Sequence, residues 1–319
     1  MPLRSALVSL VAAAGVAGAG GPAAPIEFKG HPAEVTAVAF SRDGKSLAVA
    51  TVDGSVTLWD VAGGRRRAAW KAHAKAAFAV AFRPDGRVLA TGGSDALART
   101  WDAATGRAVK TLEGHAVSVS SLAYAPDGKT LYSRSADPIR VWDAETGTEV
   151  ATLGPKGGCQ CMALSPDGRH LATVSAVRVQ VWDVRTGEAV AALEITPGVV
   201  MEVEFSPDGR AVAWGHYDRM ARIWAWGDDK PPAAFAGHTN LVNRAAFTPD
   251  GRTLVTGGLD AAVRFWDAAT GKALGELKGE TKRTQRFAVH PDGKSLALAD
   301  GTAVRLRDIT PYLAPKGER

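Results

Sequence analysis

The chain has 319 residues, of which 38 are Lys or Arg and 33 are Asp or Glu, so its formal net charge is +5. The basic residues are interleaved with acidic ones, and this pattern does not indicate a partner made of nucleic acid. The two cysteines leave no room for the disulfide framework that many exported proteins carry.

Residues 1–24 are predicted to be a signal peptide. Arg4 supplies one positive charge, residues 5–19 are apolar, and Ala17-Gly18-Ala19 offers small residues at the spacing of a cleavage site. The apolar run is shorter than the roughly 20 residues that span a bilayer, so we expect no membrane contact beyond export. The protein is then expected in the periplasm of a bacterium or outside the cell. The alternative is a disordered leader on a cytosolic protein.

The remainder of the chain contains seven copies of one unit. An Asp-Gly turn preceded by Pro or Arg recurs with its Asp at positions 43, 85, 127, 167, 208, 250 and 292, at steps of 40 to 42 residues. A period near 40 indicates the blades of a β-propeller rather than the shorter units of a solenoid.

Each copy is predicted to hold four strands. The alternating run VTAVAF at 35–40 precedes the turn, LAVAT at 47–51 follows it, and VTLWD at 56–60 forms the third strand. A short run such as RAVKTLEG at 107–114 supplies the fourth. Since no helical periodicity follows residue 25, the fold is predicted to be all-β, with one domain of antiparallel blades at 25–309.

Two dipeptides mark most copies. Gly30-His31, Gly114-His115 and Gly237-His238, with Ala72-His73 in the second copy, come before the turns, and Trp-Asp ends most third strands. In this the chain resembles the WD-repeat family of β-propellers. The resemblance covers 25–309 and implies a rigid, non-catalytic platform for protein partners. We expect a monomer.

The two ends of the repeat complement each other. The last copy stops at VRLRD, residues 304–308, without a fourth strand, whereas residues 26–29 stand where fourth strands stand elsewhere. The N-terminal strand is therefore predicted to complete the seventh blade and close the ring. Residues 310–319 are left as a C-terminal tail.

The resemblance also implies buried hydrogen-bonded tetrads of His, Ser or Thr, Asp and Trp. It assigns complete sets to the first and third copies, His31, Thr51, Asp53, Trp59 and His115, Ser135, Asp137, Trp142. In the second and sixth copies glycine replaces the hydroxyl at positions 93 and 258, which leaves His73, Asp95, Trp101 and His238, Asp260, Trp266. The three other copies keep fewer members.

No pattern of residues indicates catalysis. The chain has no phosphate-binding glycine loop, no nucleophile elbow and no histidine pair at metal-ligand spacing. Cys159 and Cys161 are two apart on a predicted strand and are expected to be small buried residues, since they are too few to complete a metal site. We expect no enzymatic activity, no metal and no cofactor.

The first strands of a propeller line its channel, and three of them carry a charge. Aligned on the turn Asp, the third residue of each first strand is small in the first four copies but is Glu202, Arg244 and Arg286 in the last three. These side chains form either an internal ion-pair network or a recognition patch.

Further polar residues fall on the loops of the last three copies. They are Tyr217, Arg219, Asn240, Asn243, Lys282 and Arg283. Because Tyr and Arg are frequent in interface hot spots, we expect an acidic protein or peptide to dock there, together with the charged channel residues. The alternative is a small anionic ligand held in the channel by Arg244 and Arg286, with hydrolase or lyase activity.

Overall fold

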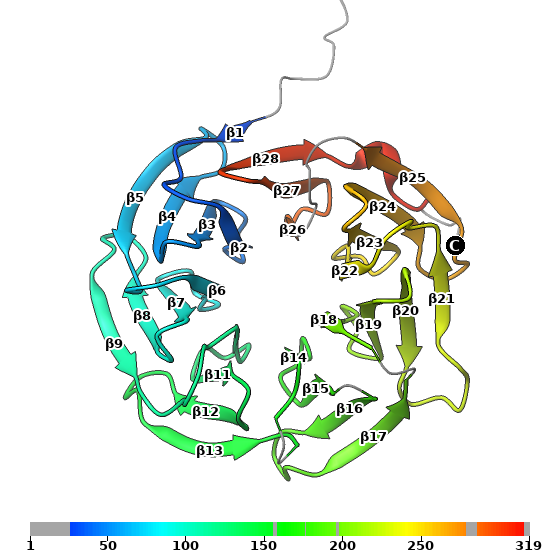
Figure 1. The fold of residues 1–319 in the computed structure, drawn as a ribbon, viewed down its shortest axis with the longest axis horizontal. Coiled ribbons are helices and arrows are strands. Elements are labelled where there is room, and N and C mark those ends of the chain that lie inside the picture. Colours follow the sequence, from blue (N-terminus) through cyan, green and yellow to red (C-terminus); the bar gives the residue numbers. More distant parts are fainter. Residues whose placement is uncertain (1–25, 156–157, 176, 196–197, 279–285, 316–319) are drawn as a thin grey trace, which may run out of the picture.

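The computed structural model describes residues 26–155, 158–175, 177–195, 198–278 and 286–315. Within them, seven four-stranded sheets form blades around a central opening (Figure 1). Blade one holds β2 to β5 and each later blade takes the next four strands, except that blade seven holds β26, β27, β28 and β1. The predicted seven-bladed all-β propeller is thus confirmed.

The strands occupy four layers from the channel outward. The first strands are β2 (Val35–Phe40), β6 (Ala77–Phe82), β10 (Ser121–Tyr124), β14 (Cys161–Leu164), β18 (Val200–Phe205), β22 (Val242–Phe247) and β26 (Phe287–Val289). The second strands are β3 (Ser46–Thr51), β7 (Val88–Gly93), β11 (Thr130–Arg134), β15 (His170–Val174), β19 (Ala211–His216), β23 (Thr253–Gly258) and β27 (Ser295–Asp300).

The two outer layers follow the same order. The third strands are β4 (Ser55–Asp60), β8 (Ala98–Asp102), β12 (Ile139–Asp143), β16 (Arg178–Asp183), β20 (Met220–Ala225), β24 (Ala262–Asp267) and β28 (Ala303–Asp308). The outermost strands are β5 (Arg65–Lys71), β9 (Ala108–Leu112), β13 (Glu149–Leu153), β17 (Ala189–Glu194), β21 (Ala233–Ala236), β25 (Ala273–Lys278) and β1 (Glu27–Phe28).

The ring closes through its first strand. β1 pairs antiparallel with β28, with Glu27 opposite Arg305 and Phe28 opposite Val304. Figure 1 shows β1 lying along β28 at the outer edge of blade seven. The closure predicted from the two ends of the repeat is confirmed.

The repeated turn has one geometry in all seven blades. Each turn Asp accepts a hydrogen bond from the backbone N–H two residues later, at 2.7 to 3.1 Å. The glycine after it has φ between 69° and 73°, a region that favours glycine. This requirement explains why Asp-Gly recurs.

The core lies between neighbouring blades. The second strand of every blade carries one completely buried aliphatic residue: Leu47, Leu89, Leu131, Leu171, Val212, Leu254 and Leu296. In blades one to six this residue is paired with the tryptophan of the third strand, whereas in blade seven it faces Arg307. The repeated Leu–Trp pair therefore builds the apolar contacts between blades.

The first residues of the C-terminal tail also pack on the propeller. A short 3-10 helix, η1 (Thr310–Tyr312), stacks Tyr312 on Phe265 with ring centroids 4.7 Å apart. The Ala314 amide donates a hydrogen bond to Thr253. In the part of the chain that the structure describes, no helix is long and apolar enough to cross a membrane.

Candidate functional site

Blade two holds a complete tetrad. Trp101 donates to Thr91 Oγ1 at 2.9 Å, Thr91 lies 2.9 Å from His73 Nε2, and His73 Nδ1 lies 2.8 Å from Asp95 Oδ1. A neutral imidazole protonated on Nδ1 satisfies every member of this chain of hydrogen bonds. The chain joins the loop before the first strand to the second and third strands.

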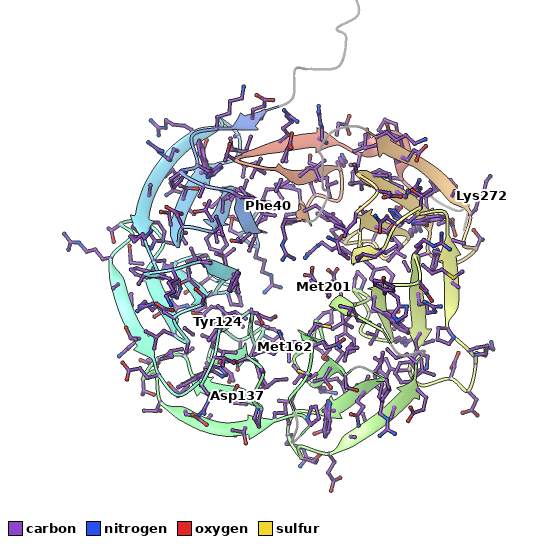
Figure 2. The ribbon with its side chains drawn as sticks, viewed as in Figure 1. Phe40, Tyr124, Asp137, Met162, Met201 and Lys272 are labelled. Atoms are coloured by element: carbon purple, nitrogen blue, oxygen red, sulfur yellow. The ribbon has the colours of Figure 1, made fainter. Side chains whose placement is uncertain are left out.

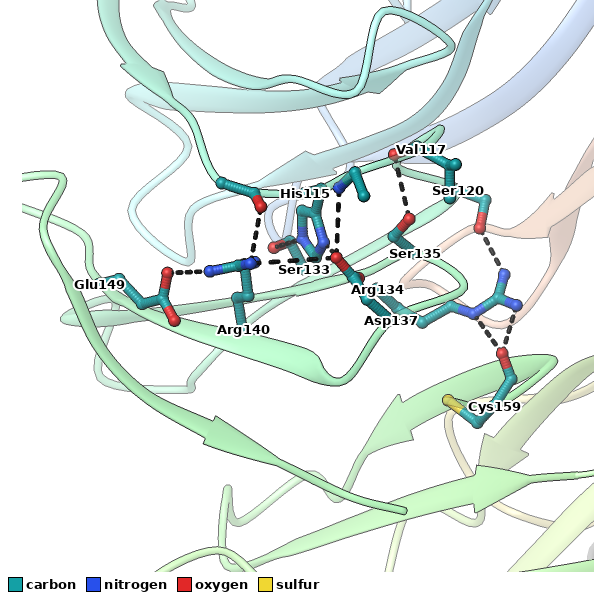
Figure 3. A network of polar contacts seen from close by, with 12 residues as sticks. His115, Val117, Ser120, Ser133, Arg134, Ser135, Asp137, Arg140, Glu149 and Cys159 are labelled. Carbon is teal, nitrogen blue, oxygen red and sulfur yellow. Dashed lines mark hydrogen bonds and ion pairs between the residues drawn. The ribbon is translucent and has the colours of Figure 1, made fainter. Parts of the chain in front are cut away.

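The hydroxyl of the tetrad comes from two residues earlier than the resemblance implied. In blade three Ser133, and not Ser135, accepts from Trp142 at 2.7 Å and lies 2.6 Å from His115 Nε2. Ser135 instead donates to the Val117 carbonyl at 3.0 Å, as Figure 3 shows. His115 Nδ1 completes the chain at 2.6 Å from Asp137.

Gly93 and Gly258 do not mark missing hydroxyls. A Cβ atom at these positions would lie 2.2 Å from His73 Nδ1 and 2.5 Å from His238 Nδ1, so glycine leaves room for the imidazole ring. Blade six is accordingly complete: Trp266 donates to Thr256 at 2.8 Å, and His238 lies 2.8 Å from Thr256 and 2.9 Å from Asp260. The sequence-based interpretation of both blades as lacking a hydroxyl was wrong.

Blade one uses a different hydroxyl. Thr57 on β4 lies 2.9 Å from His31 Nδ1 and accepts from Trp59 at 3.0 Å. Thr57 pairs across the strands with Val49, which stands where blades two, three, four and six carry the Ser or Thr that accepts from the tryptophan. Asp53 accepts from Thr51 at 2.6 Å, and among the described residues no carboxylate accepts a hydrogen bond from His31. Thr51 is therefore not the hydroxyl that contacts His31.

In blades two and six, the tetrad aspartate forms an ion pair with an arginine, and this arginine is the cross-strand partner of the tetrad threonine. Arg99 pairs with Thr91 across the strands and reaches Asp95 at 2.8 Å, and Arg264 repeats the arrangement with Asp260 at 2.8 Å. Although burial alone would raise it, hydrogen bonds from His238, the Thr239 amide and Arg264 lower the pKa of Asp260 to about 2. The sequence analysis did not identify these arginines, although each follows its Asp at a spacing of four residues.

His31 should make the protein sensitive to acid. Burial lowers its pKa from 6.5 to about 4, and the residue is only 6% exposed. His31 takes up a proton near pH 6.5 in the unfolded state but only near pH 4 in the folded state. The free energy of unfolding therefore falls by about 3 kcal/mol as the pH is lowered from above 6.5 to 4. We expect His31→Gln to be less stable than the wild type at pH 7. The difference between their free energies of unfolding should become smaller by about 3 kcal/mol at pH 4.

Denaturant unfolding of both proteins at several pH values checks this expectation. The gap between the two proteins should stay constant above pH 7, where His31 is neutral in both states. A gap that does not change between pH 7 and pH 4 would contradict the role given to His31.

Blades four, five and seven lack the full tetrad. In blade four Trp182 donates to Thr173 at 2.8 Å. In blade five His216, on the second strand, has its Nδ1 3.1 Å from Asp218 and packs against Gly198 of the preceding loop. In blade seven Arg305 forms ion pairs with Asp300 and Glu27, both at 2.8 Å, and so ties β1 to the ring.

The channel contains the charged residues that the alignment singled out. A central cavity of about 930 Å³ is lined by Glu202, Arg244 and Arg286, together with the small residues at the same position of the other first strands. Arg244 forms an ion pair with Glu202 and lies 4.0 Å from Glu204. Its guanidinium carbon is 5.1 Å from the centre of the Phe287 ring. Arg244 is therefore held on several sides.

Glu204 and Arg286 also line the channel, and their surroundings differ from those of Arg244. Burial raises the pKa of Glu204 to about 7, against the opposing effect of Arg244. No acidic group in the described ranges lies within ion-pair distance of Arg286. Glu204 was missed by the sequence analysis, although it lies two residues after Glu202 and so on the same side of β18.

The loop residues predicted to bind a partner have mixed positions. Tyr217 is 64% exposed and lies in the loop between β19 and β20 with the exposed Arg219, whose φ is 71°. Asn240 is exposed and accepts a hydrogen bond from the Leu241 amide. Asn243 is only 5% exposed and lies at the β-bulge between Val242 and Arg244, so the expectation that it lies on the surface was wrong. Lys282 and Arg283 lie outside the described residues.

Neither cysteine forms a disulfide. Cys159 and Cys161 are free and buried, and burial raises the pKa of both thiols. Within the described ranges, no group of three His, Cys, Asp or Glu residues is arranged to hold a metal ion.

Two protein-family models match the chain. The model described as the IFT122 first beta-propeller matches residues 77–304, which is more than two thirds of the chain, and the model described as WD domain, G-beta repeat matches residues 25–60. A comparison with curated proteins gave no match. With seven blades that repeat one turn, and tetrads in several of them, the chain belongs to the WD-repeat β-propeller family.

Proposed function

We propose that this protein is a non-catalytic platform that docks an acidic protein or peptide. WD-repeat propellers are generally protein-interaction scaffolds without enzymatic activity. The docking surface proposed here is the Gly-His face, defined as the loops that join successive blades and the loops that join second to third strands.

One observation carries this proposal. The Gly-His face and the adjoining start of β18 hold six of the nine exposed large apolar side chains of the described residues, namely Val52, Val117, Val177, Val199, Met201 and Tyr217. Figure 2 shows Met201 beside the central opening. Exposed apolar side chains that gather on one face of a protein are typical of interaction surfaces. Arg219 beside Tyr217 and Arg286 in the channel favour an acidic partner.

Tyr217 and Arg219 are the residues to test. Their loop is fixed by Asp218, which forms an ion pair with Arg222 at 2.6 Å, so substitutions on either side of it should leave the fold intact. We expect Tyr217→Ala combined with Arg219→Gln to lower partner recovery about tenfold or more, because hot-spot residues contribute about 2 kcal/mol each.

Cross-linked capture with tagged proteins measures this recovery. It is made from the extracytoplasmic fraction, because residues 1–24 are proposed to direct export to the periplasm or beyond. The control is Val150→Ala, which removes a 60% exposed apolar side chain from the outer strand β13. Partners should be kept by the wild type and the control and lost by the double variant. Equal recovery with all three proteins would refute the proposed docking surface.

A further inference from the structure

The charged side chains around the central cavity do not balance. Its lining holds three arginines, Arg134, Arg244 and Arg286, and two glutamates, Glu202 and Glu204. With every group ionised the lining has one excess positive charge. The cavity therefore favours an anion over a neutral molecule of the same size.

Arg286 is one of two arginines in the lining that no carboxylate neutralises in the described residues. Glu202 and Glu204 both lie against Arg244, whereas no described carboxylate lies within ion-pair distance of Arg286. Burial and the charge of Arg244 lower the pKa of the Arg286 guanidinium, against the opposing effect of Glu202. Arg286 also lines a second cavity of about 180 Å³ between blades seven and one, so space surrounds it on two sides.

Arg134 adds a second cation that no carboxylate pairs with in the described residues. Its guanidinium donates to the Cys159 carbonyl at 2.8 Å and to the Ser120 hydroxyl, both neutral acceptors, as Figure 3 shows. These bonds hold Arg134 in the wall of blade three without neutralising its charge. Arg134 therefore makes the electrostatic potential of the cavity more positive. Its guanidinium is already held by these hydrogen bonds and is not available to pair with a ligand.

The remaining lining sets the chemical class of the ligand. Phe78 and Met201 present apolar surface, while Ser118 and Ser121 present hydroxyl groups. A guanidinium pairs in a bidentate manner with a planar oxyanion such as a carboxylate. One excess charge matches a monoanion better than a dianion.

We propose that the central cavity binds a monovalent organic carboxylate, with the carboxylate on Arg286 and the apolar part against the exposed apolar side chains of the channel wall. The carboxylate belongs either to a free small molecule or to the C-terminus of a peptide. This site goes beyond the platform function. Arg286 also belongs to the surface proposed to dock an acidic partner, but a ligand in the channel requires no contact with Tyr217 or Arg219.

Calorimetry with matched probes tests the site. Benzoate and its neutral counterpart benzamide represent the free ligand, and acetyl-Ala-Ala-Phe with a free or an amidated C-terminus represents the peptide. We expect at least one acid to bind the wild type about tenfold tighter than its neutral counterpart, since a charge-assisted hydrogen bond to the guanidinium is lost with the neutral probe. Preference for benzoate identifies a free ligand, and preference for the peptide acid alone identifies a peptide terminus.

Three variants make the result specific. Arg286→Gln should abolish the preference for the acid, and Arg286→Lys should retain part of it because the charge remains without the planar fork. Arg107→Gln removes an exposed arginine outside the cavity and should change nothing. Thermal unfolding confirms that each variant is folded. The proposal is overturned if neither acid is preferred by the wild type, or if Arg286→Gln keeps the preference.

Discussion

Replacing Phe28 with alanine should lower the free energy of unfolding by about 3 to 5 kcal/mol, the usual cost of truncating a buried phenylalanine. Phe28 is fully buried in β1, and its ring packs edge-on against Trp59 with centroids 5.5 Å apart. The strand has only two residues, so this side chain supplies most of its apolar contact. Deleting residues 25–29 should cost more, because the pairing with β28 is lost as well.

Denaturant unfolding followed by tryptophan fluorescence measures this effect. Lys29→Ala is the matched control, because the Lys29 side chain is 70% exposed and its surface ion pair with Glu27 contributes little. The control should unfold within about 0.5 kcal/mol of the wild type. If Phe28→Ala also stayed within 1 kcal/mol, β1 would not be what keeps the ring closed.

The second large effect is expected in blade three. Ser133 supplies the hydroxyl of the observed tetrad, whereas the family resemblance implied Ser135. Ser133→Ala leaves His115 Nε2 and Trp142 Nε1 buried without their partner. Each such group costs about 1 to 3 kcal/mol, so a loss of about 2 to 4 kcal/mol is expected. Ser135→Ala removes only the bond to the Val117 carbonyl and should cost about 1 kcal/mol.

The two serines control for each other. Both are completely buried, and the same atom is removed in each variant. Equilibrium unfolding of the two variants under identical conditions therefore compares only the hydrogen bonds. A larger loss for Ser135→Ala would show that the hydroxyl implied by the family resemblance is the one that matters.

The number of blades and the turn could be predicted because the Asp-Gly pair recurs in every copy of the repeat. The closing strand could be predicted because the last copy lacks a fourth strand and residues 26–29 supply one. The tetrad hydroxyl could not be placed, since Ser133 and Ser135 are two residues apart and extend to the same side of the chain. Only the position of the His115 ring decides between them. Asn243 was misplaced for a related reason: it lies at a β-bulge, which interrupts the alternation of the strand and has no signal in a single sequence.

The channel charges show a similar limit. The repeat period was sufficient to place Glu202, Arg244 and Arg286 around one cavity, because the same strand position recurs in each blade. Which of them pair depends on side-chain reach across neighbouring blades. Arg244 contacts both glutamates, and Arg286 is left to the cavity.

The pairing of β1 with β28 also has a consequence for how the protein folds. The ion pair between Glu27 and Arg305 joins residues 278 positions apart, so the strand synthesised first can pair only with one synthesised last. Until β28 is available, Phe28 cannot pack in blade seven and the ring keeps open sheet edges. Such a large sequence separation slows the final step and makes the incompletely folded chain prone to aggregation.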